Sequence, residues 1–183
     1  MGKRNLSAVI PVFNEESNIE PLYLELKKSL DDLKREKRIT DYEIIFVNDG
    51  STDQTSAALN KAKKSDKLIK LVELRKNFGQ TAALKAGFDN AKGEIIVTMD
   101  GDLQNDPKDI AALITKLDEG YDVVSGWRHN RQDKFGKKIS SRIMNRLRKK
   151  LIGDELHDYG CSLKIYRKEC VKDLELFGEL HRY

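Results

Sequence analysis

Short runs of apolar, β-branched residues alternate along this chain with longer segments whose apolar residues recur at helical spacing. The short runs predict strands over residues 6–11, 43–48, 69–74, 94–99 and 121–125. An alternation of strands with helices is typical of βαβ units. We therefore expect an α/β domain with a mostly parallel central sheet and helices on both of its faces.

The predicted helices lie between these strands. The first has its apolar residues on one face from Ile19 to Leu33, and Ser17 with Glu20 three residues later is typical of a capping box. Two more are predicted over residues 52–64 and 80–91. A fourth begins at Asp106-Pro107, where a capping residue precedes a proline at the first helical position.

Each predicted strand runs directly into a polar cluster. The clusters are residues 12–16, 48–53, 76–80, 100–104 and 126–128. In an open parallel sheet the carboxyl ends of the strands share one edge, and ligands bind in the crevice there. Polar loops alone would explain one or two such clusters but not carboxylates in three of them, so the pattern predicts a binding site at this edge.

Asp100 and Asp102 follow the apolar strand over residues 94–99. In an extended chain, residues i and i+2 point the same way about 6–7 Å apart. Two carboxylates so placed, with the Gln104 amide two residues further on, suit Mg²⁺ or Mn²⁺. An EF-hand is excluded because its sixth position would be Asn105 and its twelfth Ala111. The alternative is a turn in which the aspartates only cap backbone groups.

The usual nucleotide-binding loops are missing from the sequence. Neither G-x-G-x-x-G nor G-x-x-x-x-G-K-[ST] occurs, which argues against a Rossmann dehydrogenase and a P-loop NTPase. A nucleotide would instead be held by the carboxylates of Glu15 and Asp49, as acceptors for a base and a ribose, with the ring face of Phe13. The alternative for Asp49 is a plain turn before a helix.

The ordered motifs PVFNEE (11–16), NDGSTD (48–53), DGDLQ (100–104) and SGWR (125–128) resemble those of inverting A-type-fold glycosyltransferases. Within that class, NFGQTAA, LHDYGC and GELHRY resemble the polyprenyl-phosphate hexosyltransferases, the dolichol-phosphate mannose synthase and bactoprenol glucosyltransferase kind. The resemblance covers nearly the whole chain. It implies a Rossmann-like A-type fold in a single catalytic domain, residues 1–183, with a nucleotide-binding half over about 1–105 and an acceptor-side half over about 106–183.

The resemblance also implies roles for particular residues. The pocket for a GDP- or UDP-linked sugar would be lined by Pro11, Phe13, Glu15, Val47, Asp49, Gln80, Asp100, Gly101, Asp102 and Arg128. The ligands of Mg²⁺ or Mn²⁺ would be Asp100, Asp102 and Gln104. Arg128 would meet the diphosphate. Together with Arg142, expected at the acceptor phosphate from the charge of its segment, and Asp158, the candidate base for a hydroxyl acceptor, the expected catalytic set is Asp100, Asp102, Arg128, Arg142 and Asp158.

The positive charge of the chain is concentrated in one segment. The chain has 183 residues and a net charge of +4, yet residues 128–150 hold ten basic residues and one acidic residue, a local net charge of +9. Ile139, Ile143, Met144, Leu147, Leu151 and Ile152 fall on one helical face within the basic side chains. A basic amphipathic helix of this kind commonly lies in a membrane interface, which predicts an anionic membrane surface as a partner. The alternative is a helix packed on the core with a solvated polar face.

The basic segment does not favour nucleic-acid binding. Phe135 is its only aromatic residue, and the acidic clusters would face the same partner. We therefore expect no nucleic acid partner and instead a polyprenyl phosphate acceptor, which is mostly ionised at neutral pH because its second pKa is about 6. Such an acceptor needs no general base. A hydroxyl of a polysaccharide or glycan would need one, and Asp158 is then the candidate.

The remaining composition concerns location. No apolar run approaches the roughly 20 residues of a spanning helix, and the two cysteines match no metal-site spacing. Similar enzymes usually continue beyond the equivalent of Tyr183 with a strand, a basic element and membrane helices. We therefore expect an excised catalytic domain, or a protein anchored in another way, peripheral on the cytoplasmic face of a membrane.

Overall fold

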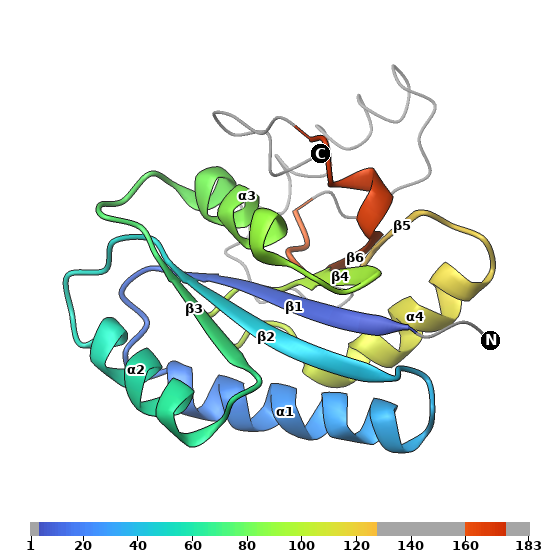
Figure 1. The fold of residues 1–183 in the computed structure, drawn as a ribbon, viewed down its shortest axis with the longest axis horizontal. Helices are drawn as coiled ribbons and strands as arrows, with labels where there is room; N and C mark the ends of the chain where they lie inside the picture. The colour runs from blue at the N-terminus through green and yellow to red at the C-terminus, as the bar shows by residue number, and fades with distance from the viewer. Residues whose placement is uncertain (1–3, 128–159, 175–183) are drawn as a thin grey trace, which may run out of the picture.

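The computed structural model describes residues 4–127 and 160–174, and these are built around one six-stranded sheet (Figure 1). The strands are β1 (Asn5–Val12), β2 (Asp41–Asn48), β3 (Ile69–Glu73), β4 (Ile95–Thr98), β5 (Val123–Ser125) and β6 (Lys164–Arg167). Their order across the sheet is β3-β2-β1-β4-β6-β5. The five predicted strands are all present, within two residues at each end.

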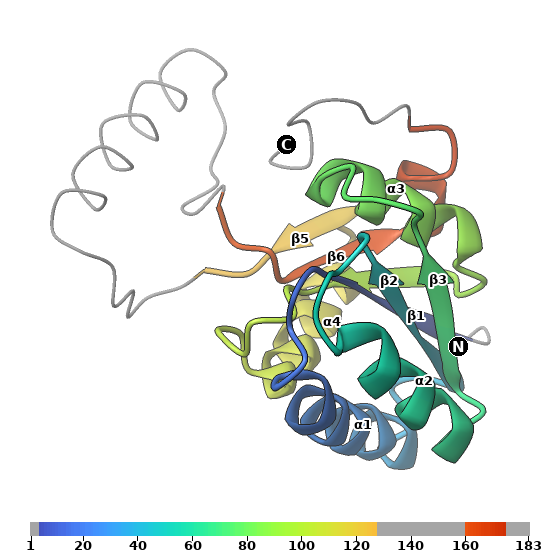
Figure 2. The same cartoon turned by 90° about the vertical axis from the view of Figure 1, so that its left-hand side faces the viewer.

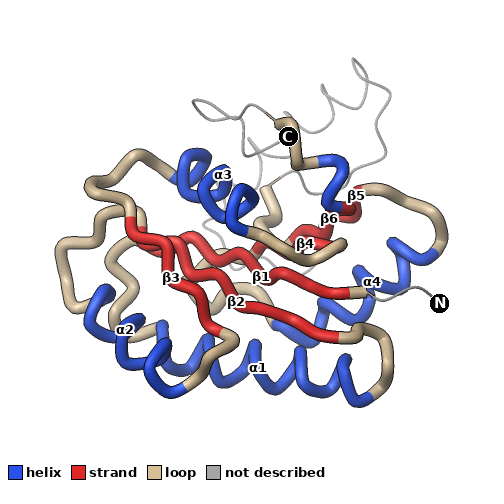
Figure 3. Tube along the Cα trace, viewed as in Figure 1, coloured by secondary structure: helices blue, strands red, loops and turns tan. Residues whose placement is uncertain are grey.

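The sheet is mostly parallel, as expected. β1 pairs in parallel with β2 and β4, and β2 pairs in parallel with β3. β6 is antiparallel to both β4 and β5, so β5 runs in the same direction as β4. The carboxyl ends of β1 to β5 therefore share one edge of the sheet, the edge at which the polar clusters were predicted to meet. Figure 3 shows the strands of the sheet and the loops at their ends.

Helices cover both faces of the sheet. They are α1 (Ile19–Arg35), α2 (Thr55–Ser65), α3 (Gln80–Asn90) and α4 (Ile110–Asp118), with the short 3₁₀ helices η1 (Pro107–Asp109) and η2 (Lys168–Cys170). Figure 2 shows α1, α2 and α4 on one face and α3 on the other. The arrangement is the α/β architecture that the alternation of patterns predicted.

The core has two parts because alternate residues of each strand face opposite sides. Leu6, Ala8 and Ile10 of β1 pack with the apolar faces of α1 and α4. Val9 of β1 and Ile45 of β2 pack instead with α3. Burial on both faces explains why these strands read as continuous apolar runs and not as alternating ones.

The helix starts follow the predictions in one case and not in another. At η1, which leads into α4, the Asp106 carboxylate accepts a hydrogen bond from the backbone N–H of Lys108, and Pro107 occupies the first helical position. The predicted capping box of Ser17 and Glu20 is wrong. Asn18 is the N-cap of α1 and makes no side-chain capping bond; its backbone dihedrals are already helical, where a capping residue is normally extended. Its amide N–H donates to the Glu15 carboxylate at 2.5 Å.

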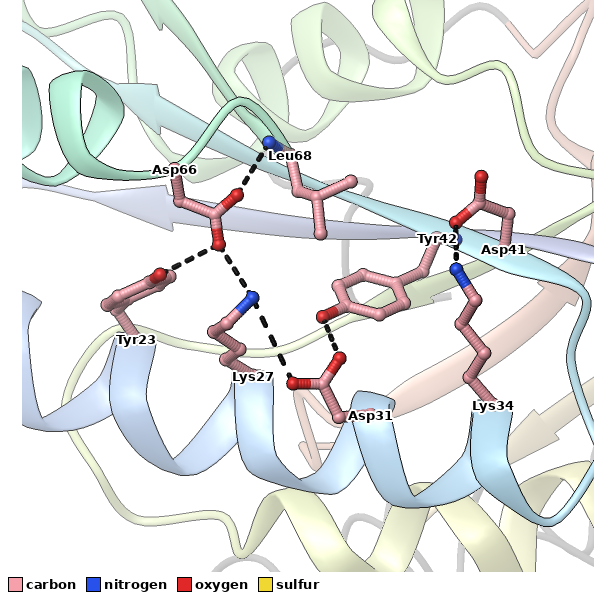
Figure 4. A network of polar contacts seen from close by, with 8 residues as sticks. All are labelled: Tyr23, Lys27, Asp31, Lys34, Asp41, Tyr42, Asp66 and Leu68. Atoms are coloured by element: carbon pink, nitrogen blue, oxygen red, sulfur yellow. Dashed lines mark hydrogen bonds and ion pairs between the residues drawn. The ribbon is translucent and has the colours of Figure 1, made fainter.

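A polar network ties α1 to the turn between α2 and β3 (Figure 4). The Asp66 carboxylate accepts hydrogen bonds from the Tyr23 hydroxyl at 2.8 Å, the Lys27 ammonium at 2.7 Å and the Leu68 backbone N–H at 2.8 Å. Burial opposes the charge on Asp66, but the bonds from Lys27 and its other donors outweigh it and lower the pKa of the carboxyl. Burial and the bond to Asp66 raise the pKa of Tyr23 to about 12.

We expect Asp66→Asn to lower the free energy of unfolding at pH 7 by about 1–3 kcal/mol, because three partly buried donors lose a charged acceptor. The lowered pKa means that Asp66 stabilises the fold above its unfolded pKa of about 3.9 and loses this contribution as the pH falls through the folded value. Urea denaturation should therefore separate wild type from variant less at pH 3 than at pH 7. Tyr23, with its raised pKa, contributes below pH 10 and loses its contribution as the pH rises toward 12.

Asp32→Asn is the matched control for that experiment. Asp32 pairs with Arg35 one turn along α1, and both side chains are largely exposed. Exposed pairs of this kind contribute about 0–1 kcal/mol. An equal loss of stability in the two variants would contradict a structural role for the Asp66 network.

Candidate functional site

A cavity of about 300 Å³ lies at the carboxyl edge of the sheet, between the ends of β1, β2 and β4 and the start of α3. Its lining residues are Pro11, Val12, Phe13, Glu15, Asp49, Asn77, Gly79, Gln80, Ala83, Asp100, Gly101 and Asp102. Eight of the ten residues expected to bind a nucleotide sugar are among them. The cavity thus brings together residues from four of the five predicted polar clusters. Pro11, at the end of the strand before the first cluster, also lines it.

Asp100 and Asp102 both reach this cavity from the loop after β4. The Asp100 carboxylate accepts a hydrogen bond from the Gln80 amide at 2.6 Å. Gln80 is the first residue of α3, so the start of that helix orients one member of the aspartate pair. Gly101 lies between the two aspartates, and a Cβ there would come within 2.7 Å of the Val12 side chain, which leaves room for little but glycine.

Gln104, predicted as a third metal ligand, is not among the residues that line the cavity with the two aspartates. Its side chain is exposed, and its backbone N–H donates to the Asp102 carboxylate at 3.1 Å. The reason is local backbone geometry. Leu103 has a φ of 61°, so the extended course on which the spacing argument depended ends after Asp102.

The donor set of the cavity fits a hard divalent cation. Among residues 4–127 and 160–174, no group of three or more His, Cys, Asp or Glu side chains gathers as a metal cluster. Mg²⁺ in proteins is usually bound through one or two carboxylates together with substrate phosphates and water. A pair of aspartates in an open cavity is the arrangement that such an ion needs.

Asp49 lines the cavity and also fixes the loop before α3, which forms part of the cavity lining. The side chain is 3% exposed, and its two carboxylate oxygens accept hydrogen bonds from the backbone N–H groups of Phe78 at 2.8 Å and Gly79 at 2.9 Å. These donors belong to the loop that leads into α3. Gly50 follows with a φ of 68°, and a Cβ there would lie 2.3 Å from the Lys76 carbonyl carbon. The Asp-Gly pair therefore sets the position of this loop.

The loops after β1 and β2 are joined by hydrogen bonds. The Asn14 amide oxygen accepts from the Thr52 N–H at 2.8 Å, and the Asn14 N–H donates to the Ser51 hydroxyl at 2.9 Å. The Glu15 N–H donates to the Thr55 hydroxyl at 2.8 Å. Much of the two motifs thus serves to dock one loop on the other, which leaves Phe13 and Glu15 at the cavity.

Val47 is placed differently from the prediction. It is wholly buried in the core between the sheet and α3, next to Ala83, and does not line the cavity. Alternate residues of a strand face opposite sides of the sheet, and Val47 faces the core that packs against α3. It therefore belongs to the core beneath the cavity and not to the cavity lining. Phe13, by contrast, is 43% exposed and offers a ring face.

The predicted pocket did not include Val12, Asn77, Gly79 or Ala83, although all four line the cavity. Asn77 and Gly79 stand in the polar cluster after β3, which was the available signal. A second cavity of about 700 Å³ adjoins the first and shares Phe13 and Asn77 with it. Its lining includes Arg75 and Lys76, which bring positive charge near the site.

Several predicted residues lie outside the described part of the chain. These are Arg128, Arg142 and Asp158, together with the basic segment over residues 128–150 and its predicted amphipathic helix. Within the described ranges, no helix has the length and apolar character needed to cross a bilayer.

A mostly parallel sheet with an aspartate pair after β4, at a cavity on its carboxyl edge, defines the class of A-type glycosyltransferase folds. Within that class the chain belongs to glycosyl transferase family 2, whose family model matches residues 7–175. It is 46% identical over 181 residues to a dodecaprenyl-phosphate galacturonate synthase of Rhizobium johnstonii, a match that covers 97% of this chain and 52% of that protein. The chain thus spans about half the length of this relative.

Solved structures share the fold at low sequence identity. A mannosyltransferase from Pyrobaculum calidifontis in complex with GDP-Man and Mn²⁺ has a TM-score of 0.68 and 22% identity, over 97% of this chain and 48% of its own. Glucosyl-3-phosphoglycerate synthase from Mycobacterium tuberculosis, in complex with Mn²⁺ and UDP-glucose, has a TM-score of 0.70 and 21% identity, over 94% of this chain and 59% of its own. At this level of identity the likeness shows a shared fold.

Proposed function

We propose that this chain is the catalytic part of an enzyme that transfers a hexosyl group from a GDP- or UDP-linked sugar to a polyprenyl phosphate, with inversion at the anomeric carbon. The observation that carries the proposal is the cavity in which Phe13, Glu15 and Asp49 lie with the aspartate pair Asp100 and Asp102. The 46% identical relative, named a dodecaprenyl-phosphate galacturonate synthase, supports the choice of acceptor. Mn²⁺ in the two structural neighbours supports a divalent cofactor, Mg²⁺ or Mn²⁺.

The residues of the cavity would bind the donor as follows. The ring of Phe13 packs on the nucleoside, and the carboxylates of Glu15 and Asp49 accept its hydrogen bonds. Asp100 and Asp102 hold the cation, which when bound neutralises charge on the diphosphate leaving group. The N-terminus of α3, whose first residue Gln80 lines the cavity, favours negative charge in the same place through the helix dipole. Arg128, outside the described residues, would add a cation at the diphosphate.

The acceptor side of the proposal depends on charge. A phosphate monoester with a second pKa of about 6 is mostly ionised at neutral pH, so it attacks without a general base. The basic segment over residues 128–150, with Arg142 in it, would meet the acceptor phosphate and the anionic surface of a membrane at its cytoplasmic face. In this proposal residues 1–105 form the nucleotide-binding half and residues 106–183 the acceptor-side half.

The alternative acceptor is a hydroxyl group of a polysaccharide or glycan. It would need a general base, for which Asp158 is the candidate. Assays that offer the full chain polyprenyl phosphate or an oligosaccharide, with a panel of GDP- and UDP-sugars and Mn²⁺, separate the two acceptors. The donor is found first by thermal shift, since a ligand at 100 times its dissociation constant adds about 2.7 kcal/mol of stability.

We expect Arg142→Glu combined with Arg146→Glu to impair transfer to polyprenyl phosphate more than it impairs donor binding. Near an anionic surface each Lys or Arg contributes about 1 kcal/mol, so two reversals should also weaken binding to anionic vesicles, most clearly at low salt. Asp158→Asn should reduce transfer only modestly. If Asp158 proves essential and the two arginines dispensable, the acceptor is a hydroxyl group.

A further inference from the structure

Ser162 contacts both ends of the loop that carries the aspartate pair. It lies just before β6, and its carbonyl oxygen accepts a hydrogen bond from the Thr98 hydroxyl at 2.8 Å, at the end of β4. Its hydroxyl oxygen accepts from the Asp100 backbone N–H at 3.3 Å and from the Asn105 amide at 2.9 Å. One residue from a distant part of the chain thus holds the beginning and the end of the loop over residues 98–105.

These contacts at the two ends of the loop matter because the backbone in its middle has an unfavourable conformation. Leu103 has a φ of 61°, in the left-handed region that a side chain with a Cβ rarely adopts. Residues in such conformations persist only where the surrounding contacts fix them. Asp102 lies directly before Leu103, and its carboxylate accepts a hydrogen bond from the Gln104 backbone N–H at 3.1 Å. The position of this carboxylate therefore depends on how the loop ends are held.

Ser162 is not itself in the cavity. The residues that line the cavity include Asp100 and Asp102 but not Ser162. Any influence of its hydroxyl on a bound ligand must pass through the loop. The supporting partners of metal ligands act in this indirect way in many proteins, and their loss typically costs 10–100-fold in metal affinity.

We propose that Ser162 is a positioning residue that sets the separation of the Asp100 and Asp102 carboxylates by closing the loop between β4 and η1. This inference rests on the proposed function, in which the two carboxylates hold a divalent cation. It also connects the two halves of the chain, because Ser162 belongs to the acceptor-side half and the aspartates to the nucleotide-binding half.

The test measures Mn²⁺ binding to the full chain, by the electron paramagnetic resonance signal of free Mn²⁺, with UDP or GDP present. Ser162→Ala should weaken Mn²⁺ binding by about 10-fold, at the lower end of the range for supporting residues. Ser162→Thr keeps the hydroxyl oxygen and should restore the wild-type affinity. Asn105→Ala removes a donor to the same oxygen, so its effect should be less than additive with that of Ser162→Ala.

Ser7→Ala is the matched control. The Ser7 hydroxyl is buried, donates to the Glu43 carboxylate at 2.7 Å and accepts from the Gly93 N–H at 2.9 Å, so its loss also removes buried hydrogen bonds from the fold, away from the aspartate loop. Ser162→Ala and Ser7→Ala should each lower the melting temperature by about 2–4 °C, but Ser7→Ala should leave Mn²⁺ affinity unchanged.

Three results would overturn the proposal. Unchanged Mn²⁺ affinity in Ser162→Ala, beside a wild type that binds Mn²⁺, would show that the hydroxyl does not position the aspartates. Equal losses of Mn²⁺ affinity in Ser162→Ala and Ser7→Ala would show that the effect is a general loss of stability. A wild type that binds no Mn²⁺ with either nucleotide would overturn the metal site itself and this inference with it.

Discussion

Asp102→Ala is expected to abolish sugar transfer and metal-dependent nucleotide binding while the chain keeps its fold. The side chain lies at the cavity and takes no part in either hydrophobic cluster of the core. Its loss would remove one of two carboxylates available to the cation. Removing a group that stabilises developing charge in this way costs at least about 100-fold in rate. Transfer assays with and without EDTA, together with the melting temperature, measure both parts of the expectation.

Asp89→Ala is the matched control. Asp89 is an exposed carboxylate of α3 that pairs with Lys85, and it does not line the cavity. This variant should retain transfer and its dependence on the cation. Full activity of Asp102→Ala, or of the wild type in EDTA, would be incompatible with the proposed cation site.

Asp49→Asn is expected to weaken donor binding by about 10–100-fold, since hydrogen bonds to a charged group contribute about 1.5–3 kcal/mol. The structure adds a second expectation. Both oxygens of Asp49 accept backbone N–H groups, from Phe78 and Gly79, and an amide offers only one oxygen to them. The melting temperature should therefore fall as well, because one buried donor loses its acceptor.

Asp53→Asn separates these two effects. The Asp53 carboxylate also accepts backbone N–H groups, from Thr55 and Glu16, but it does not line the cavity. Both variants should lose stability, and only Asp49→Asn should lose donor affinity in isothermal titration. If donor affinity stays at the wild-type level in Asp49→Asn while stability falls, Asp49 only supports the loop.

The strands and helices could be predicted because their signals are local. The apolar runs at β1, β2 and β4 are buried on both faces, and the caps at Asp106 and Pro107 act within a few residues. The common edge followed from the rule that parallel strands end on the same side. This rule predicted that Phe13, Asp49 and Asp102 lie together although they stand far apart in the chain, and all three line one cavity.

Details of the site depended on backbone geometry that the sequence pattern does not express. Gln104 is exposed and does not line the cavity, and Leu103 before it leaves the extended conformation. Val47 faces the core because of its register in β2. The N-cap of α1 is Asn18 and not Ser17, and its backbone is already in the helical region.

By itself, the sequence determined the elements, the mostly parallel sheet and the set of polar clusters at its carboxyl edge, because each rests on interactions between near neighbours or on a rule of topology. Only the tertiary structure decided that β6 lies between β4 and β5 and that Ser162 closes the aspartate loop. The same holds for Asn14, which joins the loops after β1 and β2. The bonds of Asn14 and Ser162 join residues 38 to 64 positions apart, and such pairs form only when the elements that carry them are packed on one core.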